Sequence, residues 1–336
     1  MPTETRQWHL ASRPTGEPTH ENFDLREATL DEPGHDEVLV RTLYLSVDPY
    51  MRGRMRDAES YADPWAVGEP MRAGAVAEVL ESNHDEIEPG DVVNGELPWA
   101  EHAVVDGHGL RVVDDSLAPV STAVGVLGMP GATAYFGLTD VGEPVAGDTV
   151  VVNGAAGAVG SVVGQVARIG GCEVVGIAGS DTKCEWLTDE LGFDAAVNYE
   201  AEDVRERLRE ETDGVDVYFD NVGGPITDAV WPLLNVGCRV VICGQISLYN
   251  ATETPTGPRK LGQLIQTRGK IEGVLVRDYP DWSEAFERIA GWIREDELHY
   301  RETVTEGFEN APDAFLGLFE GENIGKQVVQ VAERDE

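Results

Sequence analysis

The sequence predicts an α/β fold in which a doubly wound sheet of six parallel strands is joined to a β-rich domain. Two observations carry this prediction. After residue 148, strand-like and helix-like segments alternate in a regular series, whereas residues 1 to about 122 contain only short strand-like runs separated by Pro, Gly and Asp. The chain of 336 residues is long enough for two domains that each bury a core.

The α/β series opens with its most informative stretch. A β-branched run, Thr149–Val152, leads into a glycine-rich turn, Gly154–Gly160, and small and apolar residues continue to Ile169. A second β-branched run, Val174–Ile177, follows. The order strand, tight turn, helix, strand is that of the first βαβ unit of a dinucleotide-binding Rossmann sheet.

The glycines of this stretch have two interpretations. In a dinucleotide site, Gly157 and Gly160 let the backbone approach a pyrophosphate, whose charge then faces the amides of the helix N-terminus. Gly164 would let the helix pack closely on the strand. Alternatively, all three serve packing only, in a crossover that binds no nucleotide. The strand before the turn and the helix and strand after it favour the dinucleotide site.

The remaining elements follow from the same periodicities. In the β-rich domain, strand-like runs lie at 37–45, 73–80, 91–93 and 103–105. Residues 121–139 predict a helix, a break and a second helix that lead into the α/β domain. There, strands are predicted at 149–153, 173–178, 195–198, 215–219, 238–242 and 271–276. Helices are predicted near 158–169, 181–191, 203–211, 225–234, 259–268 and 282–294.

The C-terminal segment returns to the β pattern. Its clearest run is Val328–Val331, which suggests that one domain is built from both ends of the chain. We therefore expect a β-rich substrate domain of residues 1–122 and 300–336 around a nucleotide-binding Rossmann domain of residues 123–299.

The acidic composition disfavours some classes of binding partner. The chain has 62 acidic and 25 basic residues, a formal net charge of −37, with the acids spread along the sequence. An even acidic coat argues against nucleic acids and anionic membranes as partners. It is typical of proteins that work in multimolar salt, where screening removes self-repulsion. Without a signal-like N-terminus or a membrane-length apolar run, the sequence predicts a soluble, cytoplasmic protein.

Metal and disulfide chemistry find no support in the sequence. The four cysteines, Cys172, Cys184, Cys238 and Cys243, have no C-x-x-C spacing, and the seven histidines have no H-x-x-x-H spacing. Serines lack a nucleophile-elbow context. We therefore expect no metal site, and hydrolase functions are disfavoured.

The end of the second βαβ strand indicates which dinucleotide binds. NAD sites place an acid there, but this strand ends in Ala178-Gly179-Ser180, and Lys183 follows. A small residue, a hydroxyl and a cation suit a 2′-phosphate and favour NADP. Asp181 is the counter-evidence, for which we predict a helix-capping role. Lys183 as an ordinary solvated helix residue is the alternative.

Several motifs together resemble one family. The chain is similar to the medium-chain dehydrogenase/reductases, and within them to the zinc-free branch of prostaglandin reductases and alkenal/one oxidoreductases. The similarity spans nearly the whole chain, and it is carried by Val47–Arg52 (VDPYMR), Gly128–Leu138 (GMPGATAYFGL), Ala155–Ala167, Gly179–Lys183, Phe219–Gly224, Cys243–Asn250, Glu306–Pro312 and Asn323–Lys326. The first two motifs are specific to this branch. The Gly-His-Glu zinc motif of the alcohol dehydrogenase relatives is absent.

The resemblance implies a GroES-like barrel for the β-rich domain and an NADPH-dependent oxidoreductase that reduces the C=C bond of α,β-unsaturated aldehydes and ketones. It also implies a set of NADP-binding residues: Gly157, Ala158, Val159, Gly160, Ser180, Lys183, Tyr199, Asn221, Cys243, Gly244, Gln245, Ile246, Ser247, Val274, Leu275, Val276 and Asn323.

Hydride addition to the β-carbon of an enone creates an enolate, which requires a hydrogen-bond donor at the carbonyl oxygen. Tyr249, on a strand-end loop where the family has a tyrosine, is the first candidate, alone or together with the cofactor ribose hydroxyl. Tyr50, in the VDPYMR motif, is the second. Either phenol could instead only line the pocket. Trp99 could cover the substrate or be a packed core residue.

Two other functions remain open at this point. A quinone reductase of the same superfamily would use the same cofactor fold but lacks the VDPYMR motif. A non-catalytic NADPH-binding protein would keep the cofactor residues without turnover, and the two tyrosines weigh against it. The family further implies a homodimer formed through the edge of the parallel sheet.

Overall fold

A computed structural model describes residues 2–116 and 118–334, and these fold as two compact units. The first unit contains the residues up to Gly125 together with Glu302–Asn323 and the residues from Gln327 onward. The second contains Val126–Arg301 and Ile324–Lys326. The N- and C-terminal parts of the chain thus share one unit, and the α/β series forms the other.

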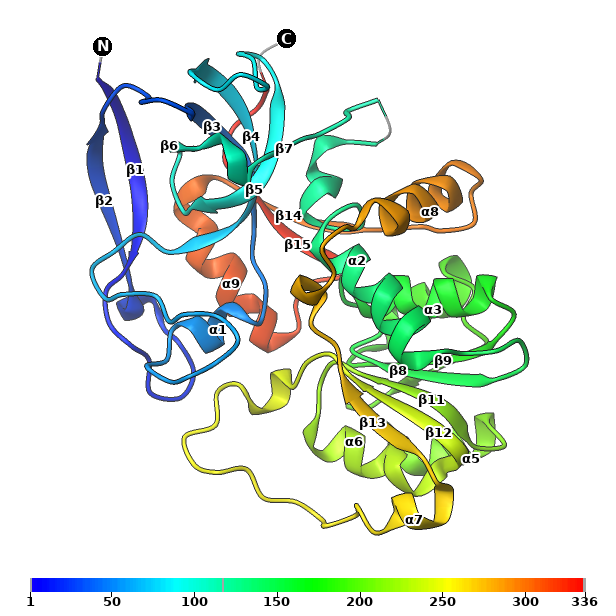
Figure 1. The fold of residues 1–336 in the computed structure, drawn as a ribbon. Coiled ribbons are helices and arrows are strands. Elements are labelled where there is room, and N and C mark those ends of the chain that lie inside the picture. The colour runs from blue at the N-terminus through cyan, green and yellow to red at the C-terminus, as the bar shows by residue number, and fades with distance from the viewer. Residues whose placement is uncertain (1, 117, 335–336) are drawn as a thin grey trace. The chain divides into compact units, whose positions relative to one another are not determined.

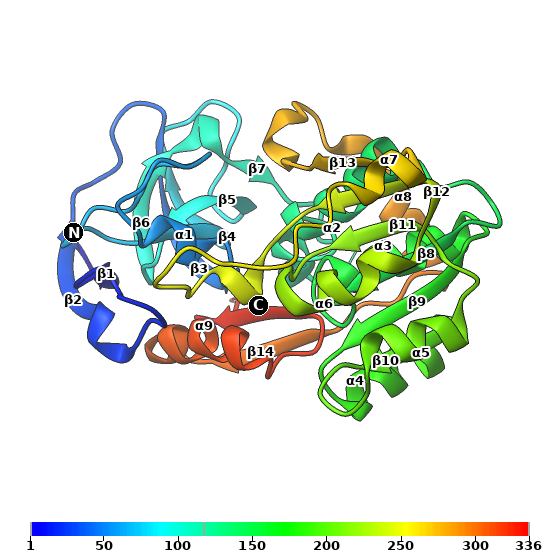
Figure 2. The same ribbon diagram turned by 90° about the horizontal axis from the view of Figure 1, so that it is seen from below.

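The second unit is built on a sheet of six parallel strands (Figures 1 and 2). Its order, β10-β9-β8-β11-β12-β13, reverses direction between β8 and β11, as in a Rossmann fold. The predicted doubly wound sheet is therefore confirmed. The strands are β8 (Thr149–Asn153), β9 (Glu173–Ala178), β10 (Ala195–Asn198), β11 (Val215–Asp220), β12 (Leu234–Ile242) and β13 (Lys270–Gly273).

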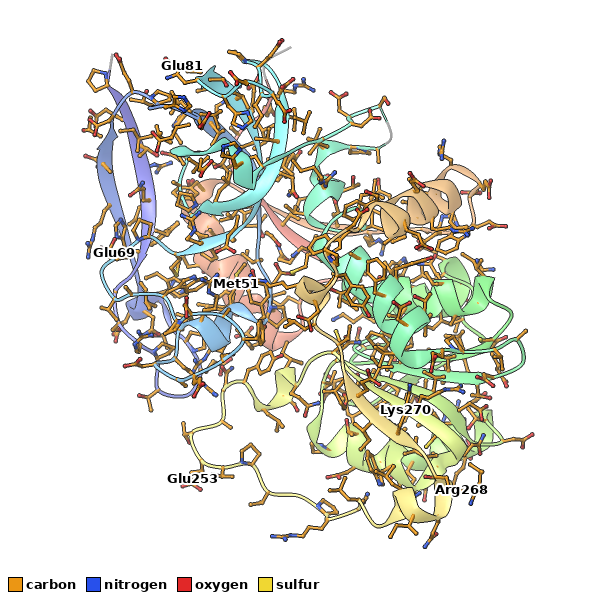
Figure 3. The ribbon with its side chains drawn as sticks, in the orientation of Figure 1. Met51, Glu69, Glu81, Glu253, Arg268 and Lys270 are labelled. Carbon is orange, nitrogen blue, oxygen red and sulfur yellow. The ribbon has the colours of Figure 1, made fainter. Side chains whose placement is uncertain are left out.

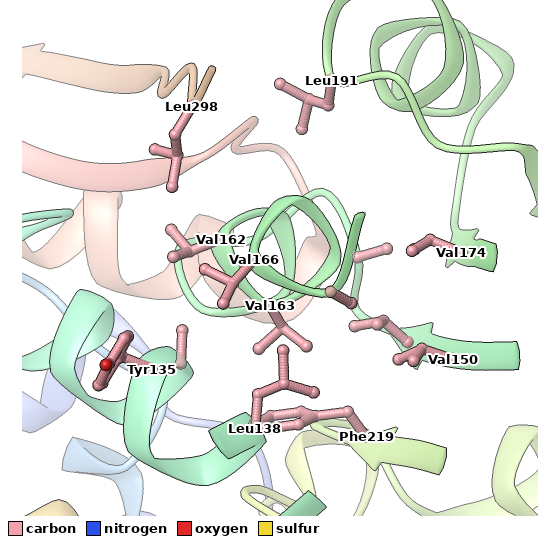
Figure 4. Packing of buried hydrophobic residues seen from close by; sticks show 14 of the residues in the cluster. Tyr135, Leu138, Val150, Val162, Val163, Val166, Val174, Leu191, Phe219 and Leu298 are labelled. Atoms are coloured by element: carbon pink, nitrogen blue, oxygen red, sulfur yellow. The ribbon is translucent and has the colours of Figure 1, made fainter. Parts of the chain in front are cut away.

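Helices cover both faces of this sheet (Figure 1). Alternate residues of β8 point to opposite faces: Val150 and Val152 join one core, and Val151 joins another. Figure 4 shows the first core, where Val163 of α3 lies close to Leu138 and Phe219. The helices are α2 (Met129–Phe136), α3 (Gly160–Ile169), α4 (Asp181–Glu185), α5 (Val204–Glu211), α6 (Gly224–Val230), α7 (Gln263–Thr267) and α8 (Ser283–Arg294).

Gly164 of α3 is required for packing, but against a different partner from the one expected. A Cβ at this position would lie 1.9 Å from the ring of Phe193, in the loop between α4 and β10. The residue therefore makes room for an aromatic side chain that inserts beside the helix, rather than for the strand. Any larger side chain would displace a ring that is itself 4% exposed.

The first unit is β-rich, as predicted. A mixed sheet with the path β14-β15-β3-β4-β5-β7, to which β6 adds along β3, accompanies a two-stranded antiparallel ribbon of β1 and β2 (Figure 1). The elements are β1 (Thr3–Leu10), β2 (Phe23–Leu30), β3 (Glu37–Ser46), α1 (Met51–Arg54), β4 (Arg72–Ser82), β5 (Val92–Pro98), β6 (His102–Asp106), β7 (Arg111–Val112), β14 (Glu302–Glu306), α9 (Ala311–Glu320) and β15 (Lys326–Gln330).

Two predicted elements are shorter in the structure. The helix predicted over 259–268 is only α7, whose N-cap is Gly262, a residue that disfavours the interior of a helix. The strand predicted over 271–276 ends at Gly273, after which Val276 turns into the apolar core and is 5% exposed. Both differences occur at the edge of the sheet, where β13 has a neighbour on one side only.

The edge strand β13 is exposed along its whole length. Figure 3 shows Lys270 on this strand and Arg268 at the end of the preceding helix, α7. Ile265 of α7 is 83% exposed, and Leu261 is 68% exposed. Among the helices in the described ranges, none is both long enough and apolar enough to cross a bilayer.

Candidate cofactor and catalytic site

The glycine-rich turn has the geometry that an anion requires. Helix α3 begins at Gly160 without a side-chain cap. The backbone amides of Val159 and Gly160 donate to no atom of the residues described. These amides are unsatisfied donors at the positive end of a helix dipole, which is the arrangement that binds pyrophosphate groups.

The two glycines of the turn differ in what surrounds them. A Cβ on Gly160 would lie 2.4 Å from the carbonyl oxygen of Gly154, so this glycine lets the turn close on itself. A Cβ on Gly157 would meet only that same oxygen, at 3.2 Å. The backbone at Gly157 is therefore open toward a ligand. The segment after Asn323 supports the turn, since the amide of Gly325 donates to the Ala156 carbonyl at 2.8 Å.

A buried polar network joins the carboxyl ends of β8 and β11, where the strand order reverses and ligands bind in such sheets. Asp220 is fully buried. One of its carboxylate oxygens accepts from Asn153 Nδ2 at 2.7 Å and from the amides of Val222 at 3.0 Å and Gly223 at 2.8 Å. The network fixes the backbone that carries Asn221, whose amide and side chain both bond to Asn153.

The second oxygen of the Asp220 carboxylate extends the network to the next loop. It accepts from Thr227 Oγ1 at 2.7 Å and from Gln245 Nε2 at 3.2 Å. The backbone carbonyl of Asp220 also accepts from the amides of Cys243 and Gly244. The loop that follows β12 is thus held against the loop that follows β11, and Ser247 adds a bond from its hydroxyl to the Val222 carbonyl at 2.7 Å.

Tyr249 lies at the end of this anchored loop, directly after the 3₁₀ turn Ile246–Leu248. Its phenol oxygen accepts from the amide of Gln245 at 3.2 Å. Burial raises the pKa of the phenol above its ordinary value, and the bond from Gln245 acts in the opposite direction. The phenol is therefore protonated at neutral pH and can donate a hydrogen bond.

The other predicted residues of this edge lie close by. Burial, and then the charge of Asp220, raises the pKa of the Cys243 thiol to about 12, so this thiol is no nucleophile at neutral pH. The amide of Val274 continues the sheet by donating to the Ile242 carbonyl at 3.0 Å. Leu275 is partly exposed, whereas Val276 is buried.

The end of β9 forms a polar corner. Ser180 is the N-cap of α4, and its hydroxyl accepts from the amide of Lys183 at 3.3 Å. Burial lowers the pKa of the Lys183 ammonium group. A Cβ on Gly179 would lie 2.7 Å from the phenol oxygen of Tyr199. Tyr199 as a whole is 40% exposed. The corner thus brings together a hydroxyl and a phenol, and Lys183 follows in the same helical turn; these residue types suit a phosphate.

Asp181 does not have the capping role that we predicted, because Ser180 occupies the cap position. The carboxylate of Asp181 instead accepts from Asn198 Nδ2 at 2.6 Å. Asn198 is the last residue of β10 and pairs with Ala178 in the register of the sheet. The acid that weighed against a 2′-phosphate therefore has a partner of its own on the neighbouring strand.

Three predicted residues belong to the first unit. Tyr50 is partly buried and precedes helix α1. Asn323 is partly exposed at the end of the segment that enters the second unit. Trp99 is fully buried between Phe23, with which it stacks, and Phe315. Burial favours the core interpretation of Trp99, and we do not include it in the proposed site.

Three polar residues of the site are not among those predicted from the sequence: Asn153, Asp220 and Asn198. Each ends a buried strand of the sheet. A polar residue that closes an apolar run, immediately before a loop that binds a ligand, is the signal that could have identified them.

The described residues contain no group of three or more His, Cys, Asp or Glu side chains that could hold a metal ion. Cys172 and Cys238 are buried, and the other two cysteines are partly buried and unpaired with each other.

Comparison with known proteins agrees with this architecture. Residues 6–113 match the family described as N-terminal domain of oxidoreductase, and residues 158–291 match the family described as zinc-binding dehydrogenase. The chain is 47% identical to the NADPH-dependent curcumin reductase of Escherichia coli, over 98% of both chains. It is 42% identical to the NADP⁺-dependent 2-alkenal reductase of Nicotiana tabacum, over 97% of both.

Among solved structures, the crystal structure of CurA from Vibrio vulnificus in complex with NADPH superposes with a TM-score of 0.93. The two sequences are 47% identical, and the match covers 98% of this chain and 100% of the other.

Fold, matched families and full-length relatives together define an oxidoreductase of the medium-chain dehydrogenase/reductase superfamily. Within it, the chain belongs to the zinc-free branch of NADP-dependent alkenal and prostaglandin reductases.

Proposed function

We propose that the protein reduces the C=C bond of α,β-unsaturated aldehydes and ketones with NADPH. The observation that carries the proposal is the position of Tyr249. Its protonated phenol belongs to the loop after β12, which is anchored to Asp220. Asp220 ends β11, the strand next to β8, where the strand order reverses. Relatives named as curcumin and 2-alkenal reductases support the same substrate class, since both names refer to conjugated carbonyl compounds.

The residues of the second unit fit NADPH. The amides of Val159 and Gly160 would bind the pyrophosphate, and Ser180, Lys183 and Tyr199 would bind the 2′-phosphate. The loops that carry Asn221 and Gly244 would hold the nicotinamide end at the carboxyl edge of the sheet. When bound, the cofactor supplies a hydride to the β-carbon of the substrate.

Tyr249 would stabilise the charge that develops on the carbonyl oxygen. A donor placed in advance at an oxyanion typically stabilises the transition state by about 3–4 kcal/mol. The α-carbon then takes a proton from solvent water, and the products are the saturated carbonyl compound and NADP⁺. Tyr50 remains the second candidate for the donor.

The proposal is tested with NADPH, a simple enal, a simple enone and a quinone, each in molar salt because of the acidic surface. We expect loss of NADPH absorbance with the enal and enone and formation of the saturated product. A preference for the quinone would favour the quinone reductase alternative. Binding of NADPH without turnover of any acceptor would favour a non-catalytic protein and contradict the proposal.

Lys183→Ala is expected to weaken NADPH binding about 30-fold and to leave NADH binding within about twofold, because one charged bond to the 2′-phosphate is lost. Lys270→Ala is the matched control. It removes an equal charge from an exposed site, where Lys270 pairs with Glu143 and Glu272 on the edge of the sheet. Equal losses for NADPH and NADH in Lys183→Ala would rule out the phosphate role.

The homodimer, the cytoplasmic location and the high-salt habitat stay predictions. For the dimer, the exposed edge strand β13 and the exposed Ile265 of α7 offer a surface that a second copy could cover. A monomeric molar mass in solution would contradict it.

A further inference from the structure

Asp181 poses a problem for NADPH binding. It is the first residue of α4 and directly follows Ser180, close in the chain to the strand end where NAD-type sites use an acid to bond the ribose hydroxyls. An unrestrained carboxylate there would repel a 2′-phosphate and attract a ribose hydroxyl. A chain with this residue needs a device that keeps the carboxylate out of the phosphate position.

Asn198 has the geometry of such a device. It is 7% exposed, and β-sheet register places it beside Ala178, the last residue of β9. Its side-chain oxygen accepts from the amide of Glu200 at 3.1 Å. The amide nitrogen is thereby directed to Asp181 Oδ1, 2.6 Å away. No other orientation satisfies both neighbours, because a backbone N–H can only donate and a carboxylate can only accept.

Asn198 also holds a second acid. Its backbone amide donates to Glu202 Oε2 at 2.9 Å, and the other oxygen of Glu202 pairs with Arg207 at 2.8 Å. The charges of Glu202 and Asp181, after burial, raise the pKa of the Cys184 thiol to about 11. Both carboxylates therefore gather around the end of β10 and Cys184.

We propose that Asn198 is a positioning residue that sets the preference for NADPH over NADH, because it ties the Asp181 carboxylate to the end of β10. With Asp181 tied, its carboxylate is directed to β10 and does not repel a 2′-phosphate bound at the end of β9. Released, the carboxylate repels that phosphate and accepts from a ribose 2′-hydroxyl. The inference rests on the proposed NADPH-dependent function and extends it to the residue that selects the cofactor.

The experiment measures the Kd of NADPH and of NADH by fluorescence titration at one fixed salt concentration, so that no substrate is involved. Asn198→Ala is made in the wild-type chain and in Asp181→Ala. In the wild-type chain it should lower the NADPH preference at least about tenfold, since it releases a carboxylate next to a phosphate. In the Asp181→Ala background, Asn198→Ala should leave the ratio of the two Kd values within about twofold of the ratio for Asp181→Ala alone.

Two further variants test whether a change in the ratio comes from the bond between Asn198 and Asp181. Asn198→Asp keeps the size of the side chain and the acceptor for Glu200, and it should lower the ratio even if Asn198→Ala fails to fold. Asn235→Ala is the matched control: it removes a similar bond, from Asn235 Nδ2 to Asp216 at 3.0 Å, at the opposite ends of the strands. Its ratio should equal that of the wild type.

The outcomes separate the inference from the proposed function. If the wild-type protein binds NADPH no more tightly than NADH, the proposed NADPH dependence fails. If the wild type prefers NADPH and Asn198→Ala changes the ratio equally with and without Asp181, or not at all, only the role of Asn198 is overturned.

Discussion

Replacing Tyr249 with Phe is expected to lower kcat for an enone about 100-fold and to change the Kd of NADPH less than about twofold. The phenylalanine ring would fit in the same place. The phenol oxygen of Tyr249 lies close to Gly244, since a Cβ built on Gly244 would be 3.4 Å from it. The donor to the enolate would be lost. The measurement is steady-state turnover together with a fluorescence titration of the cofactor.

The same phenol sets the expected pH dependence. Because burial raises the pKa of Tyr249, the protonated donor persists at least to the ordinary tyrosine pKa of about 10. Turnover by the wild type should therefore show no loss that depends on Tyr249 between about pH 6 and pH 9. A loss above that range should be absent in Tyr249→Phe.

Tyr135→Phe is the matched control for Tyr249→Phe. Tyr135 is a phenol of the same unit, but its hydroxyl bonds to Glu284 of α8 at 3.0 Å and not to the loops at the carboxyl edge of the sheet. Its removal should leave kcat unchanged. If Tyr249→Phe also leaves kcat unchanged, Tyr249 only lines the pocket. A large loss in Tyr50→Phe would then assign the donor to Tyr50.

The sheet could be predicted from the sequence because each strand is an apolar run long enough to be recognised on its own. Thr149–Val152 is β-branched throughout, Val174–Ile177 is β-branched except at Gly176, and glycines mark the turn between β8 and α3. The end of β13 does not follow from the sequence, because this strand has a single neighbour and local preference there competes with the packing of Val276.

The polar part of the site could be predicted only where it is local. Ser180 and Lys183 are neighbours in sequence, and their relation follows from the N-cap pattern. Asn153 and Asp220 are 67 residues apart. They meet because β11, and not β10, lies beside β8, which is a property of the strand order. The bond between Asn198 and Asp181 likewise depends on the register of β10 against β9.

Asp220→Ala should therefore cause the largest loss of stability among single changes at the site. Its carboxylate receives five hydrogen bonds, from Asn153, Val222, Gly223, Thr227 and Gln245. Removing it leaves buried donors without an acceptor, each at a cost of about 1–3 kcal/mol where water cannot reach. We expect the free energy of unfolding in urea to fall by about 4 kcal/mol.

Asp216→Ala is the matched control because Asp216 lies on the same strand, β11, near its opposite end. Its carboxylate accepts from the amide of Thr149 at 2.9 Å and from Asn235 Nδ2 at 3.0 Å, and it is only partly buried. Because fewer hydrogen bonds are lost and water can reach them, the free energy of unfolding should fall by only about 1 kcal/mol. Equal losses for the two variants would show that the Asp220 network contributes no more than an ordinary strand-end bond.

The network also links stability to catalysis. Gln245 bonds to Asp220 through its side chain and to Tyr249 through its backbone amide, so the loss of Asp220 loosens the loop that places the phenol. Asp220→Asn keeps the shape and an acceptor for Val222 and Gly223, but its amide presents a donor to Thr227 and Gln245. It should lower kcat about tenfold with a smaller loss of stability than Asp220→Ala. A stable Asp220→Asn variant with wild-type kcat would show that Tyr249 is placed by the turn Ile246–Leu248 alone.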